Sequence, residues 1–255
     1  MLAAVKKGHE RELAEQMRQD PGFNVNMVQD ELGWTLLHYA CHQSHRSAVI
    51  PILLAHPDID VNLITRVGNT PFLCACFYGN PSCVREMLKD SRVKPNEPDD
   101  DGWTPLYLAA RGGHLDIIRW WIASGREMDI GKPGDVEKMD AIGKAKENGK
   151  TEVVSLLEGF KSDAAQTRYP MRVEVGWYDE LAAEMFALVV FVSDGLLQIN
   201  DTTTTTPAAR YFKIARSLPL ELQMVLCHRQ VGSGKEIIPG KESEVAFREL
   251  AKRLW

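Results

Sequence analysis

The sequence lacks any long uninterrupted run of apolar residues. Its most apolar stretch, residues 185–192, has an acidic residue within two positions of either end. That stretch is far shorter than the ~20 residues that an α-helix needs to cross a bilayer. The first five residues are followed at once by Lys6 and Lys7, which does not fit a secretory signal. We therefore expect no membrane association.

Charge of one sign is not in large excess. The net charge is −5, from 30 Lys and Arg against 35 Asp and Glu, so the composition gives no support to general nucleic-acid binding. The charge is unevenly placed, because residues 207–255 contain nine Lys and Arg and five Glu, a balance of +4, which leaves −9 for the rest. This asymmetry indicates two segments with different roles, or one segment that contacts the other.

Cysteine is sparse and odd in number. The five cysteines lie inside apolar helical patterns, which predicts reduced thiols and a cytoplasmic or nuclear location. His38, Cys41, His42 and His45 fall close together, but they do not form the two spaced ligand pairs that zinc sites usually bring. We expect no metal and no other cofactor.

Catalytic motifs are absent as well. Residues 232–235 superficially resemble a phosphate loop, but Glu236 follows the Lys and Arg229 stands where the first Gly is required. No Gly-x-Ser-x-Gly elbow or zinc-protease motif occurs, and the acidic run 99–101 fits a solvated turn. We predict that the protein is not an enzyme. The alternative is an activity within residues 170–255.

What the sequence does contain is a repeat. Thr35, Thr70 and Thr104 each follow Gly-x, at intervals of 35 and 34 residues. From each Thr, alanine lies five residues on, a small residue nine on and a β-branched residue fourteen on. These positions are Ala40, Ala75 and Ala109, then Ser44, Gly79 and Gly113, then Val49, Val84 and Ile118. A unit starting at Asp140 and a partial unit around Ala4, Gly8 and Leu13 extend the repeat over residues 1–160.

The physical chemistry of these positions favours a pair of helices in each unit. Thr is a good N-cap, and Pro in the following position suits the first helical turn. Glycine nine residues on tolerates the left-handed conformation that ends a helix. One unit cannot bury its apolar face alone, so the units must stack, and the polar first and last units fit the role of caps.

Residues 35–40, 70–75 and 104–109 resemble the Thr-Pro-Leu-His-x-Ala opening of the ankyrin repeat. The resemblance implies an all-α solenoid that binds a protein partner through its hairpin tips and the adjoining short helices, and hence a non-catalytic protein–protein interaction scaffold. Carried over to this chain, the binding residues are Leu32, Trp34, Val67, Asn69, Asp101 and Trp103 at the tips, and His42, Gln43, Phe77, Tyr78 and Arg111 on the helices. Trp34, Phe77, Tyr78 and Trp103 would then line one concave strip. The alternative is that these aromatics pack on neighbouring hairpins or on the C-terminal segment.

One modification is also implied by resemblance. Leu54, followed after five residues by Asp60-Val61-Asn62, resembles the ankyrin pattern recognised by asparaginyl hydroxylases, which would modify Asn62. The same asparagine suits a structural role in closing a turn.

Beyond residue 160 the repeat stops. We predict a polar connector over 161–168, a short strand over 172–175 and a buried helix over 179–199 that breaks near residue 194. The Val-Val-Phe-Val run inside that segment also suits a strand. Five consecutive Thr before Pro207 predict a loop. The expected division is an ankyrin domain over 1–160, a connector and buried helix over 161–206, and a C-terminal helical module over 207–255, packed against the end of the solenoid.

The C-terminal module offers a second hypothesis. Residues 218–226 are similar to the opening of an F-box, and residues 247–255 loosely fit its end. This similarity implies that Leu218, Pro219 and Leu222 contact a cullin-type ubiquitin-ligase adaptor. The middle departs from the motif, because a Gly/Pro-rich loop replaces a short helix.

Overall fold

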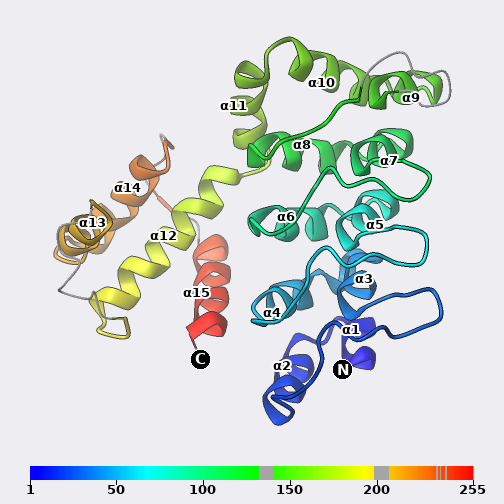
Figure 1. The fold of residues 1–255 in the computed structure, drawn as a ribbon. Coiled ribbons are helices and arrows are strands. Elements are labelled where there is room, and N and C mark those ends of the chain that lie inside the picture. Colours follow the sequence, from blue (N-terminus) through cyan, green and yellow to red (C-terminus); the bar gives the residue numbers. More distant parts are fainter. Residues whose placement is uncertain (132–139, 198–206, 234, 236, 239, 255) are drawn as a thin grey trace. The chain divides into compact units, whose positions relative to one another are not determined.

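The computed structural model describes residues 1–131, 140–197, 207–233, 235, 237–238 and 240–254. The chain divides into two compact units, Met1–Val175 and Gly176–Trp255. The described residues form helices and no strand, which confirms the all-α prediction (Figure 1). The predicted threonine loop at 201–206 lies outside the described residues.

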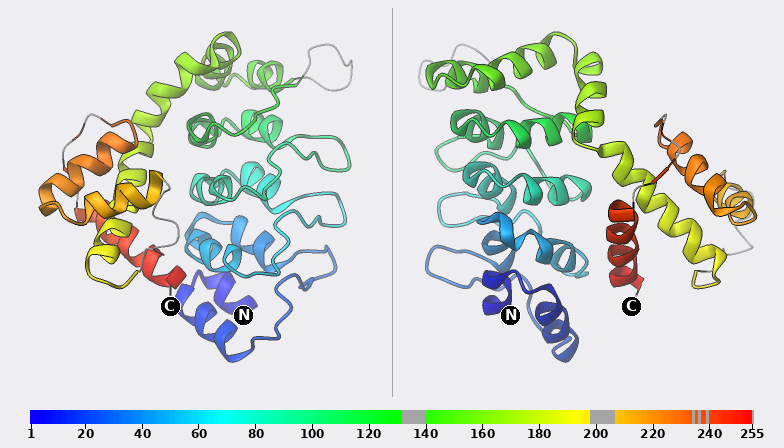
Figure 2. Two further views of the ribbon diagram at one scale, coloured as in Figure 1. Left: turned by 60° about the vertical axis from the view of Figure 1, so that its left-hand side comes forward. Right: turned by 180° about the vertical axis from the view of Figure 1, so that it is seen from behind.

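The first unit is a stack of helix pairs (Figures 1 and 2). The pairs are α1 (Leu2–Lys7) with α2 (Glu10–Gln19), α3 (Leu36–Cys41) with α4 (Ile50–Leu54), α5 (Pro71–Tyr78) with α6 (Pro81–Lys89), α7 (Pro105–Gly112) with α8 (Leu115–Ser124), and α9 (Ala141–Glu147) with α10 (Thr151–Ser162). First helices contact first helices and second helices contact second helices. The loops between pairs project from one side of the stack (Figure 1). The predicted solenoid is confirmed.

Side-chain caps begin α5, α7 and α9, as the repeat pattern predicts. The Oγ1 of Thr70 accepts a hydrogen bond from the amide of Leu73 at 3.1 Å, and the Oγ1 of Thr104 accepts from the amide of Tyr107 at 3.2 Å. The last pair has lost its Thr, and there Oδ1 of Asp140 accepts from the Gly143 amide at 2.6 Å. The cap therefore survives the change of residue, because Asp supplies the same acceptor.

Glycines end these helices for two reasons. Gly79 has a φ of +73°, and a Cβ placed on it would lie 2.5 Å from the ring of His114. At Gly113, with a φ of +76°, a Cβ would lie 2.7 Å from the side chain of Lys150. The left-handed backbone conformation therefore favours glycine at both positions, and at Gly79 the approach of the His114 ring from the next repeat adds a second reason.

The second pair is less regular than the others. It has Ser44 where the other units have Gly, and its second helix starts as a 3₁₀ helix, η1 (Ser44–Val49), before α4. Pro51 lies at the start of α4. A proline has no amide hydrogen to donate within a helix, so this position favours a helix start rather than a continuous α-helix.

One large apolar core runs through the stack. Trp121 is its largest fully buried side chain and packs edge-to-face on Phe72, with ring centroids 5.1 Å apart. In the last pair Lys146 occupies the position at which Cys41, Cys76 and Ala110 are fully buried. Lys146 is instead exposed and pairs with Glu158 at 2.6 Å, which makes this end of the stack polar, as expected of a cap.

The predictions of a connector over 161–168 and a strand over 172–175 are wrong. The end of α10 and a further helix, α11 (Ala164–Glu174), take up most of both ranges, and α11 packs on α8. The Nε of Arg168 donates to the carbonyl of Ile122 at 3.2 Å, and the Nε of Arg172 donates to that of Ala123 at 2.7 Å. These carbonyls belong to the last turn of α8, beyond which no further helical turn supplies amides to them. The carbonyl of Ile122 also accepts from the amide of Gly125 at 3.3 Å. Four residues of alternation are too weak a signal to compete with this packing.

The second unit is built on α12 (Trp177–Ser193). The helices α13 (Pro207–Ala215), α14 (Leu220–Gln230) and α15 (Gly240–Leu254) each contact it. The Val-Val-Phe-Val run is helical, and the helix ends next to Asp194, where the predicted break was placed. Buried alanines and Phe186 line its core. The buried ring of His228 hydrogen-bonds the carbonyl of Ile237 at 3.0 Å.

Candidate functional site

Aromatic side chains from two consecutive repeats meet at the ends of α3 and α5. Trp34 lies 5.3 Å from Tyr39, 5.5 Å from His42 and 6.4 Å from Tyr78, measured between ring centroids. His42 and Tyr78 are 4.2 Å apart, and Phe77 packs edge-to-face on Tyr78 at 4.9 Å. We call Trp34, Tyr39, His42, Phe77 and Tyr78 the aromatic cluster.

The aromatic cluster remains partly open to solvent. Phe77 is 49% exposed and Tyr78 is 41% exposed, whereas Trp34 and His42 are half-buried. Burial, together with the nearby charge of Arg46, lowers the pKa of His42. The histidine is therefore neutral near pH 7, and the cluster presents an uncharged surface.

Trp103 does not join this cluster. Its ring stacks on Tyr107, with centroids 4.5 Å apart and an interplanar angle of 18°. The pair packs with Leu73 and Leu108 in a small apolar group of its own. The four aromatics of the predicted strip are thus divided: the structure brings Trp34, Phe77 and Tyr78 together and places Trp103 against Tyr107.

The hairpin tips form a continuous edge along the stack. Leu32, Val67 and Asp101 occupy the same position in three units, and the first two are 63% and 60% exposed. The backbone links successive tips, because the Arg66 amide donates to the carbonyl of Leu32 at 3.0 Å and the Asp100 amide donates to that of Val67 at 3.3 Å. The tips therefore present their side chains at fixed spacing.

The other predicted binding residues differ in how far the fold restrains them. Gln43 and Arg111 are exposed at the ends of α3 and α7. The main chain of Asn69 is held in the fold, since its carbonyl accepts from the Nε2 of His38 at 2.9 Å and its amide donates to the Oγ1 of Thr65 at 3.2 Å.

Two basic residues near the cluster were missed by the sequence analysis. The Nζ of Lys6 lies 4.4 Å from the centre of the Tyr39 ring, within cation–π range. The methylenes of Lys150 lie across Gly113. The repeat itself contained the signal for Lys6, because this residue occupies in its unit the position of His42 and Phe77.

Asn62 is held between two loops. Its Nδ2 donates to the carbonyl of Arg92 at 2.8 Å, and its Oδ1 accepts from the amide of Lys94 at 2.9 Å. Asn26 and Asn96 make the same pair of bonds one repeat earlier and one repeat later. The structural role expected for Asn62 is therefore visible, and its hydroxylation stays a prediction.

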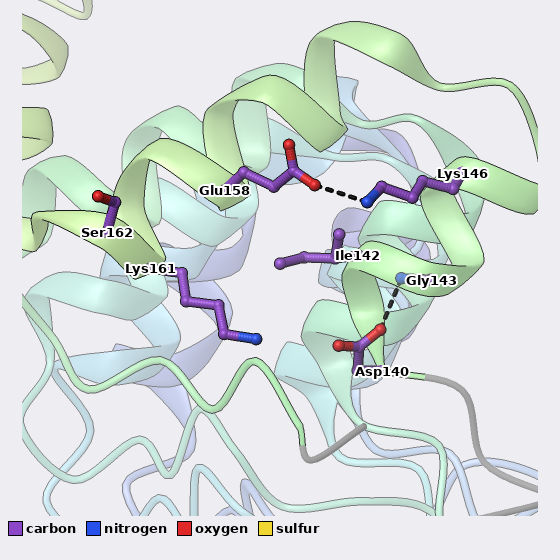
Figure 3. Close-up of a pocket in the computed structure, with 7 residues that line it drawn as sticks. All are labelled: Asp140, Ile142, Gly143, Lys146, Glu158, Lys161 and Ser162. Atoms are coloured by element: carbon purple, nitrogen blue, oxygen red, sulfur yellow. Dashed lines mark hydrogen bonds and ion pairs between the residues drawn. The ribbon is translucent and has the colours of Figure 1, made fainter. Parts of the chain in front are cut away.

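Hollows also lie elsewhere on the described part of the first unit. One, of about 400 Å³, lies between α9 and α10 at the end of the stack, where Lys161 points into it and Lys146 pairs with Glu158 (Figure 3). Another, of about 240 Å³, lies beside Trp120 and ends at residues 174 and 175. Within the described segments, no three His, Cys, Asp or Glu side chains are grouped to hold a metal ion.

The F-box-like segment lies at the start of α14. Pro219 precedes the helix, Leu222 is exposed, and the carbonyl of Leu218 accepts from the Nε2 of Gln223 at 2.9 Å. Its similarity to an F-box stays a prediction. In the part of the chain that the structure describes, no helix is long and apolar enough to cross a membrane.

The fold and the exposed surface define the class of protein: a helical solenoid of repeats of about 34 residues that present loop tips and short helices. A family model described as "Ankyrin repeats (3 copies)" matches residues 1–99 and 79–167. The chain therefore belongs to the ankyrin-repeat family, whose repeats are protein-interaction modules.

Relatives match the repeat region. The SMC5-SMC6 complex localization factor protein 1 of Bos taurus is 35% identical over 127 residues, which is 49% of this chain and 12% of that protein. Rabankyrin-5 of Mus musculus is 30% identical over 142 residues, 55% of this chain and 12% of that protein. The putative ankyrin repeat protein YahD of Escherichia coli (strain K12) is 34% identical over 90 residues, 34% of this chain and 44% of that protein. The chain thus spans a small part of the first two relatives.

Proposed function

We propose that this protein is a non-catalytic scaffold that binds a protein partner across the aromatic cluster and the adjoining hairpin tips. The observation that carries the proposal is the exposure of Phe77 and Tyr78 in the aromatic cluster, together with the exposure of the apolar tips Leu32 and Val67. Large exposed apolar groups gathered in one place mark interaction sites. Aromatic residues also supply much of the binding energy of protein interfaces.

The geometry of the surface favours this use. Trp34 and Tyr78 belong to different repeats and support each other through His42, so the rings are held by packing before any partner arrives. The tips are joined by main-chain hydrogen bonds. A surface ordered in advance loses less conformational entropy on binding than a flexible one.

Selection from a random peptide library tests the proposal. Peptides of about sixteen residues would be displayed and selected against the full chain, then measured against Phe77→Ala with Tyr78→Ala. We expect at least a tenfold loss of affinity, because the truncation removes the contact area, whereas Ser82→Ala on the outer helix α6 leaves affinity unchanged. Selected peptides that bind the double variant as tightly as the wild type would contradict the proposal.

A second candidate function is supported by one observation. Leu220 and Leu222 are each about half exposed on α14, next to Pro219, which leaves the F-box-like segment accessible to a second protein. The adaptor function requires that a purified cullin-type ubiquitin-ligase adaptor binds the full chain. It also requires that Leu220→Ala with Leu222→Ala abolishes this binding. An adaptor that fails to bind the well-folded wild type removes the candidate.

A further inference from the structure

The first helices of the repeats end in a row of equivalent side chains. The row lies two residues after the alanine of each repeat and consists of Lys6, His42, Phe77, Arg111 and Glu147. His42 and Phe77 in the middle of the row belong to the aromatic cluster. Lys6 precedes them and Arg111 follows them. Glu147 at the far end is paired with Lys144 at 2.6 Å, so its charge is balanced within the repeat.

The N-terminal side of the row is basic. Lys6 lies over the ring of Tyr39 and makes no ion pair within the described residues. Arg46 stands beside it, because its Nε donates to the carbonyl of Lys6 at 2.9 Å and its Nη1 donates to that of Tyr39 at 3.1 Å. These bonds satisfy part of the guanidinium, and no carboxylate of the described residues pairs with its charge.

The C-terminal side is basic as well. Arg111 is exposed one repeat beyond Phe77, and Lys150 reaches back across Gly113 toward the same repeat. Burial lowers the pKa of His114, the hydrogen bond with the Phe77 main chain opposes this shift, and the charge of Lys150 adds to it. Neither Arg111 nor Lys150 has an ion-pair partner among the residues that the structure describes.

The hairpin tips carry the opposite sign. Glu31, Asp100 and Asp101 are exposed there, with Arg66 as the basic exception. Charge is thus separated across the surface, with cations along the helix ends and carboxylates along the tips. A partner segment that follows the helix ends meets two basic positions with an aromatic patch between them.

We propose that this row binds an extended segment of the partner in which a large apolar side chain is flanked by acidic residues. This inference rests on the proposed function. The apolar side chain packs on Phe77 and Tyr78. One acidic residue meets Arg111 and Lys150, and another meets Lys6. Arg and carboxylate form strong paired hydrogen bonds, and complementary charge fixes the register of an interface.

The spacing of the repeats sets the length of the segment. Helices pack about 8–10 Å apart, so the three steps from Lys6 to Arg111 span roughly 24–30 Å. An extended chain covers about 3.3 Å per residue, which corresponds to about seven to nine residues. The acidic residue for Arg111 therefore lies about three residues from the apolar anchor.

Three fluorescein-labelled synthetic peptides of about twelve residues test this inference by fluorescence anisotropy with the full chain. The first has a central Trp flanked by Glu, the second replaces each Glu by Lys, and the third replaces Trp by Ser. We expect the acidic peptide to bind at least tenfold more tightly than either of the others. Its advantage over the basic peptide should shrink between 50 and 300 mM NaCl, because salt screens exposed charges.

Charge reversal supplies the matched control. Arg111→Glu with Lys150→Glu should weaken binding of the acidic peptide at least tenfold and strengthen binding of the basic one. Lys161→Glu, an exposed lysine on α10 at the end of the stack, should change neither. Circular dichroism melts of each variant verify that the fold is retained.

Equal or tighter binding of the basic peptide overturns the inference, as does an acidic peptide indifferent to charge reversal. Failure of all three peptides overturns it as well. The proposed function is judged separately, by whether library-selected peptides need Phe77 and Tyr78. Selected peptides that need these residues but carry no acidic flanks would leave the scaffold function standing and remove this inference.

Discussion

The ring of His38 joins its own repeat to Asn69 in the next. Its Nδ1 lies 3.2 Å from the amide of Thr35 and 2.9 Å from the Oγ1 of that residue, and its Nε2 lies 2.9 Å from the carbonyl of Asn69. A neutral ring protonated at Nε2 satisfies all of these contacts, because Nδ1 then accepts and Nε2 donates. The capping position of α3 and the loop before α5 are therefore held by one side chain.

Protonation of His38 should destabilise the fold. Burial lowers its pKa from 6.5 to about 4, although the bond to Asn69 and the charge of Asp30 act in the opposite direction. The unfolded chain binds the proton first as the pH falls, so the contribution is complete above pH 6.5 and is lost between pH 6.5 and 4. We expect a loss of about 2 kcal/mol at pH 5 relative to pH 7.5, measured by urea unfolding. In His38→Gln, which cannot titrate here, the pH dependence should be weaker by this amount, and identical profiles would contradict the assignment.

Gly79→Ala should destabilise the stack more than Gly149→Ala. Both glycines have positive φ, but a Cβ at Gly79 meets the ring of His114 at 2.5 Å, whereas nothing lies within 4 Å of one at Gly149. The left-handed conformation alone costs about 1–2 kcal/mol for alanine. We expect that loss at Gly149, and about 1–3 kcal/mol more at Gly79 from the steric conflict. Chemical denaturation measures both, and equal losses would show that the ring moves aside freely.

Asn62→Ala should loosen the contact between the loop of Asn62 and the loop at residues 92–94. The substitution removes both bonds of Asn62, to the carbonyl of Arg92 and from the amide of Lys94, so we expect a loss of about 1–3 kcal/mol. Asn148→Ala is the control, since that side chain makes a single bond, to the carbonyl of Arg111 at 2.9 Å. Hydrogen exchange should quicken at residue 94 in the first variant only. Unchanged exchange there would mean that other contacts hold the loop.

Trp103→Ala should mainly lower stability, whereas Phe77→Ala should mainly lower binding. Trp103 stacks on Tyr107 within an apolar group, so its truncation should lower the free energy of unfolding by about 2–4 kcal/mol. Phe77 is half exposed, and its truncation should change stability by about 0.5 kcal/mol or less. Thermal unfolding measures the first effect, and affinity for library-selected peptides measures the second. A similar loss of stability in both would place Phe77 in the core.

The repeat could be recognised from the sequence because its signals are local. A Thr at the cap, a Pro in the first turn and a Gly at the end each act on their own helix. The equivalence of Asp140 with the three threonines was visible for the same reason. The helix α11 could not be predicted in this way, because long-range contacts stabilise it. Arg168 and Arg172 donate to carbonyls of α8 that are more than forty residues away.

In the candidate site, too, some features follow from local sequence and others depend on contacts between repeats. Residue types at the loop tips could be assigned from the repeat position alone, and Leu32 and Val67 are exposed there. The contact between His42 and Tyr78 could not be foreseen, since it depends on how one repeat rests on the next. Lys6 was overlooked because its unit is incomplete, although its position in the row equals that of His42.

The amino-acid sequence by itself determined the period, the capping residues and the helical pairs, because each depends on interactions within a few residues of the chain. Only the tertiary structure decided which aromatic side chains contact one another. Trp34 and Trp103 occupy the same position in their repeats, yet Trp34 meets His42 and Tyr78 whereas Trp103 meets Tyr107. That difference arises from the side chains that the surrounding helices bring to each site, and from their packing in three dimensions.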